Sequence, residues 1–353
     1  MAIKVGPFAE PGCDALLDWP LEATTTKLVF SFPSLLSGSS IVVCRTADTQ
    51  GTVDVGVGSP RDAAWWYFNT NVREAMLENP HHPYWCAPNE PVFPWEQYMN
   101  WYAQFLYEFA KILYSFGRRA VIGEFSVGCP TLASWRFYGP ALKAIHELGA
   151  IQGVHGYGPL NRYYTLKFEA DEIEFQKLGF YNTPVIITEC GAESLPEVGW
   201  QPWKKQFGDI QTYFDQYIAP LARYLHNIRY CAGAHLFCEG TNQDSRWDDY
   251  NVAFQGLPQM MVNLSRELGP APPMEKPRML IPRFIFKTPL QIILPAGMSA
   301  EIYDKPFGKL RRVLMASKAE DYLMDVYEVR GVWFKVYPKP GRSGLDMWVA
   351  YMG

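Results

Sequence analysis

The sequence predicts an α/β fold in which a (β/α)8 barrel is followed by a small all-β barrel. Up to about residue 268, short apolar runs alternate with segments of helical period, as expected when strands and helices alternate. A proline-rich break follows, and beyond it the helical period disappears. We therefore divide the 353-residue chain into a barrel domain (1–268), a semi-rigid linker (269–278) and a small β domain (279–353).

The barrel prediction depends on eight short runs of strand-forming residues. They lie at 3–8, 27–32, 41–46, 84–89, 120–125, 152–157, 184–189 and 232–237. Long apolar faces of helical spacing run from Trp95 to Phe116 and from Phe207 to Ile228, and shorter helical segments cover 140–148, 166–178 and 252–268. Eight strands with intervening helices over this length match a (β/α)8, or TIM, barrel. The helices after the first two strands are expected to be short.

The net charge of −4 is divided unevenly along the chain. From Arg278 onward there are 12 Lys and Arg residues against 7 Asp and Glu, whereas the rest of the chain has 20 against 29. A basic C-terminal part indicates contact with something anionic, such as a cell wall or nucleic acid, or simply a solvated basic surface. Of these, we predict a cell-wall polymer as a partner, and neither nucleic acid nor a membrane.

Cysteine usage and the absence of familiar motifs narrow the chemistry. Seven cysteines, an odd number, lie mostly inside apparent strands, which indicates thiols packed as small hydrophobes in a reducing compartment. Residues 1–7 lack the layout of a secretory leader, and no apolar run is long enough to cross a bilayer, so action outside the cell would need lysis or another route. With no phosphate-binding glycine loop, Cys-x-x-Cys or His-Glu-x-x-His motif, no metal or organic cofactor is expected.

Two glutamates stand at the C-terminal ends of predicted strands. The run Tyr-Trp-Cys-Ala-Pro-Asn-Glu-Pro (84–91) ends the fourth strand at Glu90, and Val-Ile-Ile-Thr-Glu-Cys-Gly (185–191) ends the seventh at Glu189. A buried strand that ends in a carboxylate presents it at the upper rim of a parallel barrel. Glycosidic cleavage needs two such groups, one to protonate the leaving oxygen and one to attack or to activate water. The competing interpretation makes Glu90 an acidic helix start before Pro91.

With these motifs, the first three quarters of the chain resemble clan A of the glycoside hydrolases. In that clan the acid/base is the Glu of Asn-Glu-Pro after strand 4, and the nucleophile is a Glu after strand 7. The resemblance implies that Glu90 is the acid/base, that Glu189 is the nucleophile and that Asn89 bonds the sugar 2-hydroxyl. It also implies a retaining hydrolase of β-linked polysaccharide or oligosaccharide, with carboxyl groups about 5–5.5 Å apart. A wall polysaccharide and a plant-type β-glycan both remain open as substrates.

Further candidate residues lie at the ends of other strands. The strand-6 His-x-Tyr of the clan corresponds to His155 and Tyr157, with Tyr157 holding the nucleophile ionised and His155 contacting a carboxylate or the sugar, unless His155 is a core histidine. Glu124, near the end of strand 5, is expected to face the lumen and contact substrate hydroxyls. Indoles near strand ends suit stacking on sugar rings, although each alone fits a core position equally well. They are Trp65, Trp66, Trp85, Trp95, Trp135, Trp200, Trp203 and Trp247.

Two features depart from the clan. Many members carry an arginine at the end of strand 2, whereas here the candidate is Arg45 on strand 3; many stack the sugar on a strand-8 tryptophan, whereas here Phe237 and, further along, Trp247 are the candidates. The missing strand-8 tryptophan motivates an alternative, in which the chain is an inactive carbohydrate-binding or phage-structural protein on the same barrel. The presence of both Glu90 and Glu189 argues against it. A cation such as Arg45 beside Glu189 would favour the enzyme.

The C-terminal part carries its own resemblance. Predicted strands at 291–294, 300–303, 325–329, 331–337 and 347–351 include the runs Gly-Val-Trp-Phe-Lys-Val (331–336) and Asp-Met-Trp-Val (346–349). These runs resemble bacterial SH3-type domains, which commonly bind cell walls. The alternative is a plain β-rich extension that caps the main barrel.

Overall fold

The computed structural model describes residues 3–9, 26–29, 41–46, 53–192, 194–195, 199–200, 202–239, 252, 256–279, 283–294, 299–303, 310–315, 322–330, 333–337 and 347–350. The chain forms two compact units, Met1–Phe175 with Asn182–Arg278 and Gln176–Tyr181 with Met279–Gly353. The described linker residues belong to the first unit in this division. The domain limits at 268 and 279 stay predictions.

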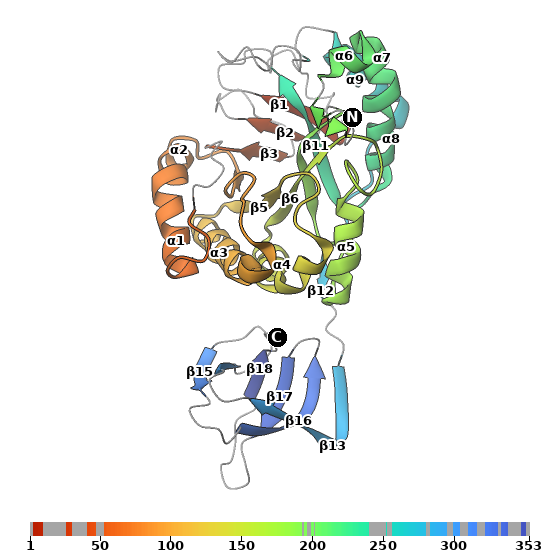
Figure 1. Ribbon diagram of the computed structural model, residues 1–353. Helices are drawn as coiled ribbons and strands as arrows, with labels where there is room; N and C mark the ends of the chain where they lie inside the picture. Colours follow the sequence, from red (N-terminus) through yellow and green to blue (C-terminus); the bar gives the residue numbers. More distant parts are fainter. Residues whose placement is uncertain are drawn as a thin grey trace. The chain divides into compact units, whose positions relative to one another are not determined.

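Eight parallel strands of the first unit close into a barrel in the order β1-β11-β8-β6-β5-β4-β3-β2 (Figure 1). They are β1 (Val5–Ala9), β2 (Thr26–Val29), β3 (Ile41–Cys44), β4 (Tyr84–Cys86), β5 (Arg119–Phe125), β6 (Ile151–Tyr157), β8 (Val185–Gly191) and β11 (Cys231–Glu239). The ring closes where Val5 of β1 lies beside Ala234 of β11 and Phe8 lies beside Leu28 of β2. The eight strands predicted from the sequence are therefore confirmed, with differences of a few residues at their ends.

Helices lie outside the barrel strands (Figure 1). They are α1 (Pro60–Tyr67), the π-helix η2 (Phe68–Val72), α2 (Arg73–Glu78), α3 (Trp95–Ser115), the 3-10 helix η3 (Leu132–Phe137), α4 (Gly139–Leu148), α5 (Phe168–Lys177), α6 (Trp203–Phe207), α7 (Ile210–Tyr213), the π-helix η4 (Phe214–Ile218), α8 (Ala219–Asn227) and α9 (Leu257–Leu268). Ser59 begins α1 by accepting a bond from the Asp62 amide, and α4 ends where Gly149 adopts φ 70°. Residues 10–25 and 30–40 lie outside the described part, so the short helices predicted there stay predictions.

A single predicted helix over 207–228 divides into α7, η4 and α8, and the π-helix holds Tyr217. The Tyr217 hydroxyl donates to the carbonyl of Gly191 (2.9 Å) and meets the Thr165 hydroxyl (2.9 Å), which itself donates to the carbonyl of Gly158 (2.8 Å). The Gly158 amide also donates to the carbonyl of Gly191 (2.8 Å). This buried network fixes the ends of β6 and β8 relative to one another, and π-turns inside helices often occur beside functional sites.

A buried apolar cluster fills the inside of the barrel. It consists of Phe8, Val43, Cys86, Val121, Ile151, Tyr157, Ile186, Ala232 and Phe237. Because these contacting residues come from strands all round the ring, they face the interior rather than the helices. Cys44, Cys86, Cys190 and Cys231 are buried free thiols, in agreement with a packing role.

The second unit contains a six-stranded sheet in the order β13-β16-β17-β18-β14-β15, with every pairing antiparallel. Its strands are β13 (Arg283–Leu294), β14 (Ser299–Tyr303), β15 (Leu310–Met315), β16 (Tyr322–Arg330), β17 (Trp333–Tyr337) and β18 (Met347–Ala350). β15 lies in a stretch where the sequence analysis places no strand. The resemblance to SH3-type domains stays a prediction.

Two small sheets complete the described secondary structure. β9 (Ser194–Leu195) pairs with β10 (Gly199–Trp200), and β7 (Phe180–Tyr181) pairs with β12 (Arg278–Met279). Within the described ranges, no helix combines the length and the apolar character that a bilayer crossing requires.

The close contact at Gly156 gives a test of the packing around β6. A Cβ atom at Gly156 would lie 2.8 Å from the backbone oxygen of Thr165, so Gly156→Ala should lower the unfolding free energy by about 1–3 kcal/mol through overpacking. Gly139→Ala is the matched control, since nothing lies within 4 Å of its added Cβ. Urea denaturation of both variants measures the difference; equal stability would contradict the packing described.

Candidate functional site

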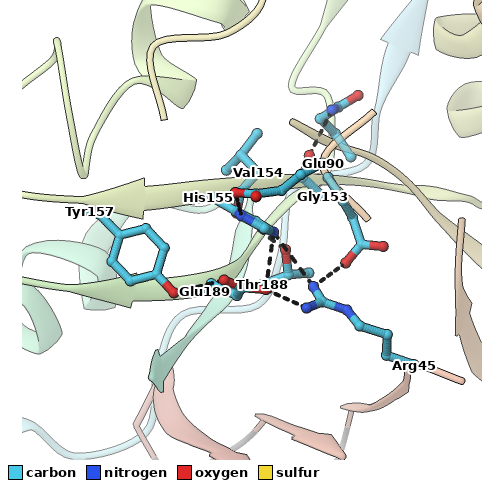
Figure 2. Close-up of polar contacts among 10 residues, drawn as sticks. Arg45, Glu90, Gly153, Val154, His155, Tyr157, Thr188 and Glu189 are labelled. Carbon is cyan, nitrogen blue, oxygen red and sulfur yellow. Dashed lines mark hydrogen bonds and ion pairs between the residues drawn. The ribbon is translucent and has the colours of Figure 1, made fainter. Parts of the chain in front are cut away.

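Charged and polar side chains gather at the C-terminal ends of five adjacent barrel strands. They are Arg45 after β3, Asn89 and Glu90 after β4, Glu124 near the end of β5, His155 and Tyr157 on β6, and Glu189 on β8. Parallel strands present their C-terminal ends on one rim, so residues far apart in the sequence meet there. Figure 2 shows the resulting contacts among Arg45, Glu90, His155, Tyr157 and Glu189.

Glu189 lies at the centre of these contacts and is 8% exposed. Its carboxylate accepts a bond from the Tyr157 hydroxyl (2.7 Å) and one from the Arg45 guanidinium, and it lies 3.4 Å from Nε2 of His155. Burial by itself raises the pKa of Glu189, but His155, Arg45 and Tyr157 together hold that pKa below its usual value. Glu189 is therefore ionised at neutral pH and held in orientation by two donors, Tyr157 and Arg45, with the His155 ring beside it.

His155 bridges the two glutamates that the sequence analysis singles out. Its Nδ1 lies 2.8 Å from Oε1 of Glu90, and its Nε2 faces Oε1 of Glu189 (Figure 2). The imidazole ring of His155 thus contacts both carboxyl groups. The separation of about 5–5.5 Å between the two carboxyl groups stays a prediction. Burial lowers the pKa of His155, whereas Glu189 and Glu90 raise it by more, so the net direction favours the imidazolium. His155 belongs to the site and is not a simple core histidine.

Glu90 sits in an unusual backbone conformation. Its φ is 41°, in the left-handed region, and its amide donates to the carbonyl of Glu124 (3.1 Å), which has φ 39°. Non-glycine residues with positive φ are uncommon and concentrate at functional sites. The helix that follows begins only at Trp95, so Glu90 is not the N-terminal acid of a helix. Asn89, beside it, is 4% exposed.

Arg45 reaches Glu189 although it follows β3 and not the second strand. Its Nη2 also donates to Oε1 of Glu124 (2.8 Å), and its guanidinium lies 5.3 Å above the ring of Phe8. Since Arg45 is 1% exposed, these anions and the ring replace the water that its charge loses on burial. The predicted cation beside Glu189 is thus present.

The remaining candidates differ in how close they come to this cluster. Glu124 is fully buried, with 0% exposure, which favours support of Arg45 over contact with substrate. Phe237 packs between the rings of Phe8 (5.1 Å) and Tyr157 (6.1 Å) and so lines the site. Trp247 lies outside the described residues.

The tryptophans divide between core and surface. Trp85, Trp135 and Trp203 are at most 1% exposed and belong to the core, whereas Trp65 and Trp66 are exposed on α1. The side chains of Trp95, Trp200 and Trp247 lie outside the described part. Hydrophobicity alone could not separate these groups, because a core indole and an exposed one have the same chemistry.

One residue of the site, Phe8, is not among the candidates predicted from the sequence. Phe8 ends the first strand and packs against Arg45; its position at a strand end, shared by the other candidates, is the signal that could have found it. His235 is fully buried on β11, and burial, with Arg45 nearby, lowers its pKa to about 3. His235 is therefore neutral at physiological pH. Among the described residues, no group of three or more His, Cys, Asp or Glu side chains is arranged to hold a metal ion.

Comparison with known proteins gives distant structural similarity only. No protein-family model matches the sequence, and no curated protein matches it. Solved structures similar to this chain include a GH128 (subgroup I) endo-beta-1,3-glucanase from Amycolatopsis mediterranei, with 12% identity and a TM-score of 0.45 over 76% of this chain and 100% of that one.

Two further examples of similar solved structures follow. One is an endo-beta-1,4-mannanase from Thermotoga petrophila (11% identity, TM-score 0.41, 99% of this chain and 97% of that one). The other is a GH128 (subgroup VII) oligosaccharide-binding protein from Trichoderma gamsii (13% identity, TM-score 0.41, 74% of this chain and 94% of that one). These values assign neither a family nor an activity, and the barrel itself is established by its strand pairing.

The bridging position of His155 makes its titration a test of the site. In the wild type, the C2 proton of His155 should titrate above the usual value of 6.5, and Glu189→Gln should lower that midpoint because the larger charge contribution is lost. Proton NMR can follow the six histidines, with assignment by His155→Asn. Glu267→Gln, an exposed carboxylate paired with Arg223, should leave the midpoint unchanged. An unshifted His155 in Glu189→Gln would contradict the bridge.

Proposed function

We propose that this protein is a retaining glycoside hydrolase that cleaves β-glycosidic bonds of a polysaccharide. The observation that carries the proposal is the pair Glu90 and Glu189 on one barrel rim, joined through His155, with Arg45 and Tyr157 holding the second carboxylate ionised. Two carboxyl groups in different surroundings are the equipment that this reaction requires.

The first step uses the difference between the two carboxyl groups. An oxygen of Glu189 attacks the anomeric carbon and forms a glycosyl ester while the glycosidic carbon–oxygen bond breaks. Protonated Glu90 gives its proton to the departing oxygen, which leaves as an alcohol. Tyr157 and Arg45 orient Glu189 for attack and keep it unprotonated.

The second step returns the enzyme to its starting state. Glu90, now a carboxylate, removes a proton from water, and the water oxygen displaces Glu189 from the anomeric carbon. Nδ1 of His155, 2.8 Å from Oε1 of Glu90, holds this carboxyl group in place through both steps. Two inversions at one carbon give net retention of configuration.

The position of Arg45 favours the enzyme over the inactive carbohydrate-binding or phage-structural alternative. A binding protein has no need for a carboxylate held ionised by a buried guanidinium and a tyrosine hydroxyl. Burying such charges is costly, and buried perturbed groups cluster where chemistry occurs. The roles of Asn89, Phe237 and Trp247 in sugar binding remain part of this proposal.

We further propose that residues 279–353 form a separate domain that directs the enzyme to cell walls. The SH3-type sequence resemblance and the excess of basic residues from Arg278 onward support it. Sedimentation of the full chain with purified wall polymer, at low and high salt, measures this binding.

Reducing-sugar release from β-glucans, mannans, xylans and peptidoglycan tests the activity. Glu189→Gln should abolish release, and Glu90→Gln should lower it by roughly 10²–10⁴-fold. With an activated aryl glycoside, whose leaving group needs no acid, Glu90→Gln should spare the initial burst of phenol release, whereas later turnover should be slow because the second step has lost its base. Glu267→Gln, exposed on α9, is the control and should retain full rate. NMR of the first-formed anomer should show retention.

Each alternative outcome identifies the part of the proposal that fails. Release that survives Glu189→Gln would mean that another group is the nucleophile. Inversion of configuration would exclude the glycosyl ester. Binding of a polysaccharide by the wild type without any release would favour the carbohydrate-binding alternative.

A further inference from the structure

Glu124 is a third carboxylate in the cluster, and substrate cannot reach it. Its side chain is 0% exposed, and Oε1 lies 2.8 Å from Nη2 of Arg45. The chemistry proposed above uses two carboxyl groups and gives Glu124 no part. A buried charge is costly to retain unless something depends on it.

The backbone around Glu124 is shaped to make room for this carboxylate. Glu124 has φ 39°, and the preceding Gly123 has φ 101°. A Cβ at Gly123 would lie 2.1 Å from Nε2 of Gln152, and one at Gly153 would lie 2.7 Å from Cγ of Glu124. The missing side chains at Gly123 and Gly153, together with the left-handed backbone at Glu124, leave space for the Glu124 carboxylate that a regular strand would not have.

The Arg45 guanidinium is divided between two anions. Nη1 donates to Glu189, whereas Nη2 donates to Glu124. Arginine commonly gives both of its parallel N–H groups to one carboxylate. Here one of the two terminal nitrogens of Arg45 is bonded to Glu124, so Glu189 receives a bond from only the other one. The second oxygen of Glu189 accepts from the Tyr157 hydroxyl.

We propose that Glu124 is a positioning residue: it holds Arg45 in place and limits the share of positive charge that Glu189 receives. The carboxylate of Glu189 then remains ionised without being neutralised by a full ion pair. The consequence for catalysis rests on the proposed glycosidase function, since it concerns how nucleophilic Glu189 is. The sharing of Arg45 does not rest on that function.

Among the described residues, few charged groups other than Arg45 face the carboxylates of Glu124 and Glu189. Around Glu124 lie the Cys86 thiol and the hydroxyls of Tyr67 and Tyr102. Burial, reinforced by neighbouring groups that include Glu124, raises the pKa of all three, and they are neutral at neutral pH. Arg45 is the cation bonded to Glu124 in the described part of the chain.

Around Glu189, the facing groups are Arg45, Tyr157 and His155, with Glu90 beyond the imidazole. His235 on the neighbouring strand β11 is neutral, because burial lowers its pKa to about 3. A change at Glu124 therefore reaches Glu189 chiefly through Arg45, which bonds both.

Glu124→Gln tests the inference by removing the charge and keeping the shape. With glutamate labelled with carbon-13 at the side-chain carboxyl, NMR titration should show the Glu189 midpoint moving to lower pH by on the order of one pH unit, because Arg45 is no longer shared. Glu189→Gln assigns the resonance. The acid limb of the kcat/KM profile should move in the same direction.

Asp171→Asn is the matched control for mere destabilisation. Asp171 is also buried (1% exposed) and also meets a cation, Lys167, at 2.8 Å, but it lies on α5 outside the barrel. Loss of that carboxylate should lower stability and leave the Glu189 midpoint in place. A purely structural role for Glu124 predicts the same result for both variants.

Two outcomes would overturn the inference: an unchanged Glu189 midpoint in folded Glu124→Gln, or an equal shift in Asp171→Asn. If Glu124→Gln does not fold, Glu124→Asp withdraws the carboxylate by one methylene and should shift the midpoint in the same direction by less; an unchanged midpoint there is equally decisive. A wild type that cleaves no glycan would remove the proposed function, yet the titration would still decide whether Glu124 shares Arg45.

Discussion

The burial of the Arg45 guanidinium between Glu124 and Glu189 is the constraint on which the rest of the site depends. A charge that is 1% exposed has lost its water, and the barrel interior has to provide anions in return. The two anions need a cation for the same reason. Each of the three side chains therefore holds the other two, and the strands that carry them must end at matching heights for the contacts to form.

Because Arg45, Glu124 and Glu189 compensate one another's charges, this polar cluster is stable next to the apolar interior of the barrel. Phe8, Phe237 and Tyr157 pack beneath and beside the charges and exclude water, which strengthens each ion pair. The hydroxyl of Tyr157 is the polar edge of that apolar layer. Tyr217, from the π-helix, holds β6 and β8 together just beyond it, so the donors and the acceptor on these strands keep their separation.

His155 gives the carboxyl groups of Glu90 and Glu189 a common partner with one exchangeable charge. A neutral imidazole can donate to one glutamate only, whereas an imidazolium can donate to both. The protonation state of one ring is thus linked to contacts with both Glu90 and Glu189.

Much of the barrel could be predicted from the sequence, because its strands are short apolar runs whose period differs from that of the helices. Glu90 and Glu189 could be located for the same reason, since each ends such a run. The sequence could not reveal that Arg45, one strand away from its expected place, turns toward Glu189, because side-chain direction depends on the shape of the closed ring. Nor could the sequence reveal that the Glu124 side chain is buried, because the residues that pack around it, such as Arg45 and Gly153, are distant from it in the sequence.

The division of the predicted helix 207–228 by a π-helical turn could not be predicted from the sequence either. A single extra residue in a turn leaves the apolar spacing almost unchanged, so the periodicity of Phe207 to Ile228 reads as one helix. The contact that makes the turn useful, from Tyr217 to the end of β8, joins residues 26 positions apart. Local pattern carries no information about such a pairing.

The left-handed backbone at Glu90 and Glu124 has a consequence for how this chain changes over generations. Glycine or asparagine at either position would relieve a conformation that costs a glutamate roughly 1–2 kcal/mol, so selection for backbone stability alone would favour them. Glutamate persists at such a place only while its carboxylate is used. In descendants that lose the proposed activity, these two positions should be among the first to change, ahead of the apolar strands that hold the barrel closed.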